Sequence, residues 1–300
     1  MEANPAALRW RSLSRYNAPM PTQPIITLLT DFGEHDAYVG AMKGVILSIT
    51  PDAQMVDITH QVAPQNIHQA ATILASVYSY YPAHTVHLAV VDPGVGSERR
   101  PIALETPHGI FVAPDNGLLT FVHLREPSST AVLLEDPSYW LPLPSNTFHG
   151  RDIFSPVAAH LARGIPIRNL GSVLDAVVKL PLAPLELTTS MIRGKVVHID
   201  HFGNLITNIG CLRWLDHDNL EFCPLPDEGS KPIQFNADKV RVTGGWHVIR
   251  GIHQTYSGVE NGQAVVVVGS NGELEVAINQ GNASDTLAIR VNDPITLHLD

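Results

Sequence analysis

The chain has 300 residues, 44% of them apolar and only 16% charged, so it is long enough for one large or two medium domains with a well-buried core. Its formal net charge of −10 argues against nucleic acid and anionic membrane as partners, because both require a basic surface. The two cysteines, Cys211 and Cys223, are too few for a disulfide framework or a structural zinc site, and they fit a reducing cytoplasm. No apolar run reaches the length that crosses a membrane.

Residues 1–23 contain three arginines but no apolar core segment, so we expect a disordered extension and not a secretory signal. A transit peptide is the alternative, because arginine and serine are present and acidic residues are scarce there.

From Ile25 onwards, short apolar strands alternate with helical patterns, which favours βαβ units and a mainly parallel sheet. The expected strands are 25–29, 55–58, 87–91 and 131–134, together with a hairpin of 102–106 and 110–113. The expected helices are 37–49, 67–80, 118–123 and 153–162.

The composition changes at the Leu- and Pro-rich stretch 180–184, which suits a linker, and the helical pattern disappears after it. The expected strands there are 191–199, 239–242, 264–268 and 274–277, with turns at 244–245, 261–262 and 271–272. The sequence therefore predicts an α/β domain at 24–178 with a mainly parallel sheet and flanking helices. A linker at 179–190 and an antiparallel β-barrel domain at 191–300 follow it.

Polar residues follow two of the expected strands. Asp31 comes after the first strand and Asp92 after the third, so both lie at the sheet edge where open α/β folds bind ligands. Arg99 follows Asp92 across a Gly-rich turn, and His149 enters from a third loop. Helix capping, turn formation and an ordinary salt bridge are the simpler explanations for each residue taken alone.

A second polar cluster spans residues 200–208, DHFGNLITN. Its asparagine side chains can pair two-fold with a purine edge, and Phe202 can stack on the base. A β-bulge loop with polar turn residues is the alternative, just as Ser270-Asn271-Gly272 also fits a plain hairpin turn.

Metal and phosphate sites are not favoured by these patterns. Asp31, Asp92, His149 and Asp200 include hard ligands, but the sequence has no HExxH motif and no close spacing of His and Asp ligands. The run GVGSERR lacks the Gly-Lys-Ser/Thr ending of a P-loop. We therefore expect no metal.

Five segments, in matching order, resemble the S-adenosylmethionine hydroxide adenosyltransferases, which are relatives of the fluorinase and chlorinase enzymes. The segments are TDFG at 30–33, VDPGVGSERR at 91–100, APDNGLL at 113–119, FHGRD at 148–152 and DHFGN at 200–204. The resemblance covers about residues 24–300. It implies an α/β domain followed by a β-barrel, and a homotrimer whose sites lie between neighbouring subunits. It also implies SN2 attack of water on the ribose C5′ of S-adenosylmethionine, giving adenosine and L-methionine. That reaction needs no cofactor besides the substrate.

The resemblance also assigns roles to individual residues. Asp92, Arg99 and His149 correspond to a water-activating triad. Asp31 corresponds to the residue that holds the ribose hydroxyls, and the adenosine contacts are Phe202 and Asn204.

The remaining correspondences concern the two ends of the substrate. Asp36, Tyr38 and Ser270 face the methionine end, with Asp200 near the methionine amino group. Glu275 and Val276 correspond to neighbours of the adenine.

Two departures from the halogenating relatives favour water as the nucleophile. The resemblance implies that those enzymes carry Tyr or a similar residue at the position of Asp92. It also implies that they carry a halide-contacting Ser or Gly in the loop that corresponds to residues 148–151 here. Here Asp92 places a negative charge that repels a halide, and Gly150 lacks the hydroxyl that fluoride would use. A halide adenosyltransferase and a non-catalytic sensor of S-adenosylmethionine or a nucleoside stay as alternatives.

Overall fold

The computed structural model describes residues 23–224 and 231–299. The chain divides into two compact units, Met1–Leu180 and Pro181–Asp300, which we call the N-terminal and C-terminal units. The extension expected at residues 1–23 lies outside the described residues, apart from its last residue.

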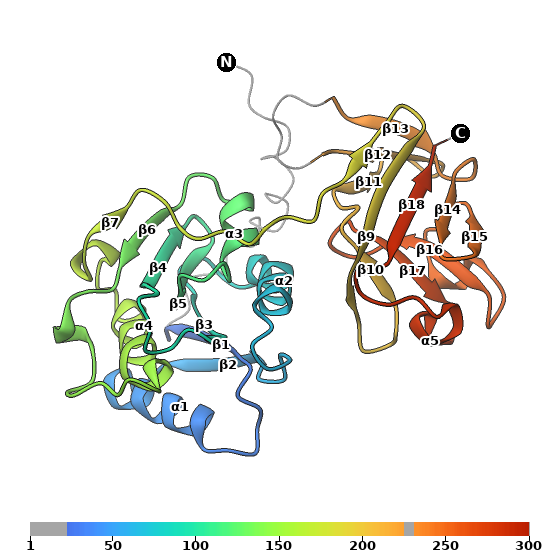
Figure 1. Ribbon diagram of the computed structural model, residues 1–300. Helices are drawn as coiled ribbons and strands as arrows, with labels where there is room; N and C mark the ends of the chain where they lie inside the picture. The colour runs from blue at the N-terminus through green and yellow to red at the C-terminus, as the bar shows by residue number, and fades with distance from the viewer. Residues whose placement is uncertain (1–22, 225–230, 300) are drawn as a thin grey trace. The chain divides into compact units, whose positions relative to one another are not determined.

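A seven-stranded sheet forms the middle of the N-terminal unit (Figure 1). Its strands are β1 (Ile25–Thr30), β2 (Gln54–Thr59), β3 (Val86–Val90), β4 (Pro101–Thr106), β5 (Gly109–Pro114), β6 (Thr130–Leu133) and β7 (Val173–Leu174). They lie in the order β2-β1-β3-β5-β4-β6-β7. The first four in this order are parallel, and β4, β6 and β7 pair antiparallel. The hairpin expected before and after residue 108 is β4 and β5.

Helices cover both faces of this sheet. They are α1 (Tyr38–Ile49), α2 (Ile67–Val77), α3 (Thr120–Arg125) and α4 (Ser155–Ala162), and a π-helical turn, Gly150–Phe154, leads into the last one. Successive strand side chains point to opposite faces. Leu28 and Leu88 therefore pack with residues of α1 and α4, and Leu29 and Ala89 pack with residues of α2 and α3. The observed layers confirm the predicted α/β class.

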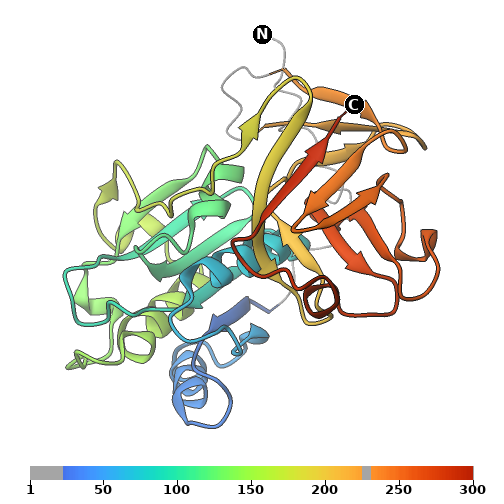
Figure 2. The ribbon, with the colours of Figure 1, turned by 45° about the vertical axis from the view of Figure 1, so that its right-hand side comes forward.

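The C-terminal unit is built from antiparallel strands (Figure 2). The larger sheet contains β8 (Glu186–Leu187), β9 (Met191–Ile199), β10 (Leu205–Thr207), β14 (Arg241–Gly244), β15 (His247–Arg250), β16 (Ala264–Val268), β17 (Leu274–Ile278) and β18 (Pro294–His298). A three-stranded sheet contains β11 (Leu212–Trp214), β12 (Asn219–Phe222) and β13 (Ile233–Asn236). The larger sheet runs from β15 to β16 and nearly closes, because the His253 amide after β15 donates to the Val266 carbonyl of β16 at 2.8 Å. The predicted β-barrel is confirmed.

Two local expectations in this unit were wrong. A helix follows the linker after all: α5 (Ala283–Leu287), whose first turn is capped by the Asn282 side chain accepting from the Asp285 amide at 2.9 Å. Five residues are too few to produce a helical period in the sequence. The strand expected at 239–242 is β14, which begins two residues later, at Arg241, and runs on through Gly244 because that residue pairs with His247 and Ile295.

Candidate active site

The carboxyl ends of β1 and β3 lie side by side at one edge of the N-terminal sheet. The strands are parallel neighbours, and Thr30 of β1 pairs with Val90 of β3. Asp31 directly follows β1, and Asp92 lies just beyond β3. Both carboxylates are therefore at the edge where open α/β sheets bind ligands, as the sequence predicts.

Asp92, Arg99 and His149 contact one another at this edge, and we call them the Arg99 cluster. Arg99 Nε donates to the two Asp92 carboxylate oxygens at 2.9 and 3.0 Å, and Arg99 Nη2 lies 2.7 Å from His149 Nδ1. The Asp92 and Arg99 side chains are only 5% and 9% exposed. The guanidinium also lies over the Phe154 ring, 5.1 Å from its centroid. Two chain segments thus meet here: the connection between β3 and β4 brings Asp92 and Arg99, and the loop before the π-helical turn brings His149.

Glycines allow the loops of the Arg99 cluster to pack closely. Gly96 has a positive φ of 77°, and a β-carbon there would lie 2.5 Å from the Asn146 carbonyl oxygen. The turn after β3 therefore touches the segment that leads to His149. Gly150 is similarly confined, since a β-carbon would lie 3.2 Å from the Phe148 ring and 3.4 Å from Met42 Sδ.

The contact between Arg99 and His149 fixes which imidazole nitrogen carries the proton. A guanidinium offers only donor hydrogens, so His149 Nδ1 accepts, and the neutral ring carries its proton on Nε2. Burial, and then the Arg99 charge, lower the pKa of His149, while Asp92 and Asp152 act in the opposite direction. His149 is therefore neutral at pH 7 and presents Nε2–H as a donor.

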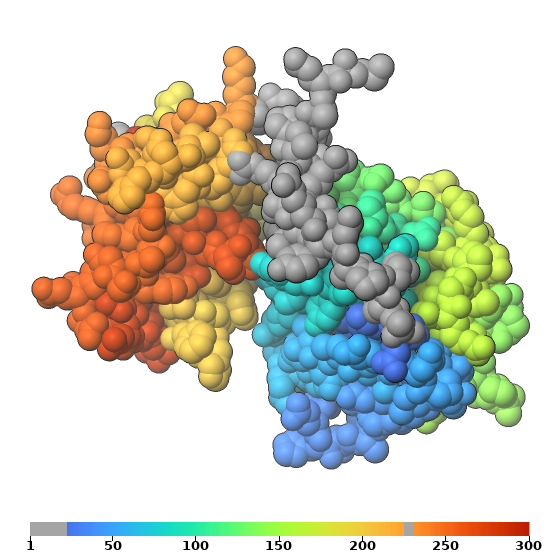
Figure 3. Space-filling view, turned by 180° about the vertical axis from the view of Figure 1, so that it is seen from behind, coloured from blue at the N-terminus to red at the C-terminus, as the bar shows by residue number. Residues whose placement is uncertain are grey.

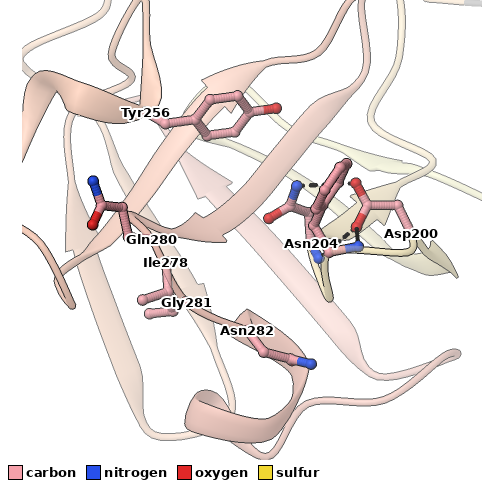
Figure 4. A pocket seen from close by; sticks show the side chains of 8 residues that line it. Asp200, Asn204, Tyr256, Ile278, Gln280, Gly281 and Asn282 are labelled. Atoms are coloured by element: carbon pink, nitrogen blue, oxygen red, sulfur yellow. Dashed lines mark hydrogen bonds between the residues drawn. The ribbon is translucent and has the colours of Figure 1, made fainter.

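A hollow of about 570 Å³ lies in the C-terminal unit (Figure 4). It is lined by Asp200, Phe202, Asn204, Tyr256, Ile278, Gln280, Gly281 and Asn282. The volume is of the size that accommodates a small organic ligand, and the lining combines aromatic, aliphatic and amide side chains. We call it the Asn204 hollow.

Asp200 orders one wall of the Asn204 hollow. Its Oδ1 accepts from the amides of Phe202 and Asn204, both at 2.9 Å, and its Oδ2 accepts from Asn204 Nδ2 at 2.9 Å. Gly203 has a φ of 86°, and a β-carbon there would lie 2.2 Å from the Asn282 side chain, so the turn needs glycine. The turn thereby orients the Asn204 amide and leaves the Phe202 ring 72% exposed.

Tyr256 and Glu275 form a hydrogen-bonded pair beside this hollow. The Tyr256 hydroxyl donates to Glu275 Oε1 at 2.7 Å, and Glu275 is 5% exposed. Burial raises the pKa of Glu275, the Tyr256 hydrogen bond lowers it, and the Asp200 charge raises it again, so that the net direction is upward.

Asp31 and Asp36 belong to the segment between β1 and α1, which stands out from the N-terminal unit in blue in Figure 3, and Tyr38 is the first residue of α1. Asp31 Oδ2 accepts from the Gln65 amide at 2.7 Å, and Asp36 is exposed. Tyr38 is 49% exposed, and its ring lies 5.2 Å from that of Phe148, the residue before His149. This segment is therefore anchored next to the His149 loop.

Ser270 and Val276 occupy different environments. Ser270 is exposed in the turn between β16 and β17, whereas Val276 is 1% exposed and packs in the barrel core. The lining of the Asn204 hollow does not include either residue.

Tyr256, Gln280 and Asn282 line the hollow but were not singled out by the sequence. Tyr256 lies in a short 3₁₀ turn that has no periodic pattern. The polar run 279–282 directly after β17 is a signal that could have marked the other two, because it resembles the strand ends considered above.

Within residues 23–224 and 231–299, no group of three or more His, Cys, Asp or Glu side chains is arranged to hold a metal ion. The helices of the same ranges are also too short or too polar to cross a membrane.

Comparison with known proteins identifies both units. Residues 26–171 match the family model of the SAM hydroxide adenosyltransferase N-terminal domain, and residues 194–296 match that of the C-terminal domain. The chain belongs to the SAM hydroxide adenosyltransferase family. It is 36% identical over 280 residues to the (R)-S-adenosyl-L-methionine hydrolase of Salinispora arenicola, covering 92% of this chain and 98% of that protein.

Further relatives and a solved structure extend this comparison. The (R)-S-adenosyl-L-methionine hydrolase of Thermus thermophilus is 37% identical over 280 residues, covering 91% of this chain and 98% of that protein. The fluorinase of Nocardia brasiliensis is 31% identical over 214 residues, covering 62% of this chain and 71% of that protein. A crystal structure of a conserved protein from Thermotoga maritima superimposes with a TM-score of 0.77 at 34% identity, over 91% of this chain and 99% of that one.

Proposed function

We propose that this member of the SAM hydroxide adenosyltransferase family hydrolyses S-adenosyl-L-methionine. Water attacks the ribose C5′, the C5′–S bond breaks with its electron pair going to sulfur, and the products are adenosine and L-methionine. The observation that carries this proposal is the Arg99 cluster, in which Asp92, Arg99 and His149 meet at the ligand-binding edge of the sheet. The relatives are named for the (R) form of the substrate, and we propose the same diastereomer here.

The difficulty of this reaction lies with the nucleophile. The leaving group is a neutral thioether, so departure requires no acid. A cation about 4 Å from a water contributes roughly 4 kcal/mol at an effective dielectric near 20 and lowers the pKa of that water by about three. Arg99 alone would therefore still leave the pKa of the water far above neutral, so a base is needed to take the proton.

Asp92 is the base that the geometry favours. His149 Nδ1 already accepts from Arg99, and its Nε2 bears the ring proton, so the neutral imidazole donates to the water and does not accept from it. Asp92 Oδ2 accepts from both Arg99 Nε and Arg99 Nη2, whereas Oδ1 accepts from Arg99 Nε and keeps a second lone pair for the water proton. The water proton passes to Asp92, Arg99 stabilises the developing hydroxide, and His149 Nε2–H orients the water oxygen.

The Asn204 hollow is the proposed adenosine contact. Phe202 stacks on the base, and the Asn204 amide pairs with the purine edge. The resemblance supplies the other assignments, which are Asp31 on the ribose hydroxyls, Asp36, Tyr38 and Ser270 at the methionine end, Asp200 near the amino group, and Glu275 and Val276 beside the adenine.

The two cysteines fit a cytoplasmic location. The resemblance also supports a homotrimer with sites between neighbouring subunits and SN2 geometry at C5′. It supports the two-domain division at 24–178 and 191–300 with a linker at 179–190. S-adenosylmethionine is the substrate in this proposal, and no cofactor takes part.

The test is incubation of the purified protein with S-adenosylmethionine, followed by chromatography. We expect equal amounts of adenosine and L-methionine. Folded protein that forms no adenosine would reject the proposal, and tight binding by calorimetry without any product would favour the sensor alternative.

The same assay in chloride or fluoride buffer tests the alternative function as a halide adenosyltransferase, for which the similarity to a fluorinase is the reason. We expect adenosine without 5′-halo-adenosine, because the Asp92 carboxylate repels halide and Gly150 offers no hydroxyl.

A further inference from the structure

Asp152 is a buried residue three positions after His149. It holds together several parts of the loop that carries His149, which spans residues 141–152. The side chain is 3% exposed. Its Oδ2 accepts from the Ser145 amide at 2.8 Å, and its Oδ1 accepts from Arg151 Nε at 2.6 Å. The Asp152 carbonyl accepts from the Leu141 amide at 2.9 Å. This one residue therefore connects the start of the loop, its middle and the turn after His149.

The backbone between Ser145 and Asp152 carries the imidazole. The Phe148 amide donates to Ser145 Oγ at 3.1 Å, and the Asp152 amide donates to the Phe148 carbonyl at 3.1 Å. His149 lies between these bonds, at the start of the π-helical turn Gly150–Phe154. Such turns are rare and frequently occur at functional sites. Since Asp152 fixes both ends of this short segment, it also fixes the position of His149.

We propose that Asp152 is a positioning residue for the reaction, because it fixes the turn that carries His149 and places a negative charge beside the imidazole. The inference rests on the proposed function for its meaning in catalysis. The contact it explains, between Arg99 and His149 Nδ1, is measurable without substrate.

The charges around the imidazole predict in which direction the protonation of His149 changes when Asp152 or Arg151 is replaced. The charged groups that act on His149 are Arg99 after β3, Asp92 at the end of β3, and Asp152 in the π-helical turn. Arg151 partly neutralises Asp152, and its guanidinium lies over the Phe148 ring, 5.1 Å from the centroid. Removing the Asp152 charge should make His149 harder to protonate, and removing the Arg151 charge should make it easier.

Two variants separate positioning by charge from simple support of the loop. Asp152→Asn and Arg151→Met break the same ion pair but remove charges of opposite sign. We would label histidine with ¹⁵N, assign His149 with the variant His149→Gln, and titrate the ring nitrogens by NMR. Relative to the unaltered protein, the titration midpoint of His149 should move to lower pH in Asp152→Asn and should stay or move to higher pH in Arg151→Met.

The kinetic readout accompanies the titration. We expect Asp152→Asn to lower kcat by at least roughly 10-fold, since misplacing a catalytic group by about 1 Å costs on the order of 100-fold. In a plot of kcat against pH, the fall in kcat on the acid side should move in the same direction as the NMR midpoint of His149. KM should change less than kcat.

Glu221→Gln is the matched control, because Glu221 is also a buried carboxylate, 5% exposed, that pairs with the partly buried Arg213. It should lower thermal stability and leave the His149 midpoint unchanged.

An unchanged or higher midpoint in Asp152→Asn, or a lower one in Arg151→Met, would overturn the inference. If Asp152→Asn unfolds below the assay temperature, the His149 midpoint in Arg151→Met decides alone. A higher midpoint then supports the inference, and an unchanged or lower midpoint overturns it. Absence of adenosine with the unaltered protein would instead reject the proposed function and leave the NMR result standing.

Discussion

The Arg99 cluster and the Asn204 hollow differ in how far their side chains are exposed. In the cluster, the Asp92 and Arg99 side chains are 5% and 9% exposed and hydrogen-bonded to each other. In the hollow, the Phe202 ring is 72% exposed on a turn whose Phe202 and Asn204 amides donate to Asp200. Buried, paired charges do not need to reorganise during a reaction, whereas an open aromatic face gains energy when a ligand covers it. This contrast suggests that the N-terminal unit contributes mainly to kcat and the C-terminal unit mainly to KM.

The largest expected effect comes from removing the base. Asp92→Asn takes away the proton acceptor, and we expect kcat to fall roughly 10²- to 10⁴-fold with little change in KM. Steady-state kinetics with S-adenosylmethionine measures both quantities.

Asp115→Asn is the control for this variant. Asp115 is also a buried carboxylate paired with an arginine, Arg100, and it holds the Val178 amide at 2.8 Å. It should lose stability and keep kcat within a few-fold of the unaltered value. Equal losses of kcat in both variants would mean that the Asp92 effect is structural, and the assignment of the base would fail.

A smaller effect, on KM, is expected in the C-terminal unit. Phe202→Ala removes the proposed stacking surface, and stacking of a base on an aromatic ring is worth about 1–3 kcal/mol, so KM should rise roughly 5- to 160-fold. Substrate titration measures this change, and kcat should stay within a few-fold.

His201→Ala is the matched neighbour, because His201 is exposed on the same turn and its ring lies 5.6 Å from that of Phe202. It should leave KM near its original value. A drop in kcat for Phe202→Ala at unchanged KM would contradict the division of labour between the units.

The smallest effect concerns the stability of the sheet beneath the cluster. His87 of β3 is fully buried, and burial lowers its pKa to about 3. Because the folded-state pKa lies below the unfolded one, protonation favours unfolding. The contribution of neutral His87 to the free energy of unfolding is fully present above about pH 6.5. It is lost as the pH falls, and the free energy of unfolding is lower by roughly 2 kcal/mol at about pH 5.

His87→Asn should flatten this dependence, because asparagine does not titrate and still offers an acceptor to the Thr27 hydroxyl, which lies 2.9 Å from His87 Nδ1. Urea unfolding at several pH values measures the slope. The exposed His201→Asn serves as the control and should keep the original slope. A His87→Asn slope equal to that of the unaltered protein would contradict the buried neutral histidine.

The first and last residues of a strand could be predicted from the sequence where a pattern of apolar residues repeats over several positions. β9 and β16 begin and end at the residues expected for them, because long apolar or alternating runs define their length. β10 and β11 have three residues each, which is too short for any period, and both were missed. Short strands form here because tertiary pairing stabilises them, and the sequence alone carries little record of such pairing.

The candidate site divides in a similar way. Asp31 and Asp92 were predictable because they follow apolar strands whose ends must share one edge. Tyr256 was not, because it lies in a short 3₁₀ turn without a periodic pattern, and only the folded barrel brings it to the hollow. Asp152 was part of a quoted motif, but its contact with the Ser145 amide depends on a loop geometry that spacing does not encode.

The most direct test of the central claim is to run the reaction in H₂¹⁸O and to analyse both products by mass spectrometry. If water held by the Arg99 cluster attacks C5′, adenosine should carry a single ¹⁸O at its 5′ oxygen, and L-methionine should carry none. Adenosine without the label, or label found in methionine, would contradict the proposed attack of water on C5′.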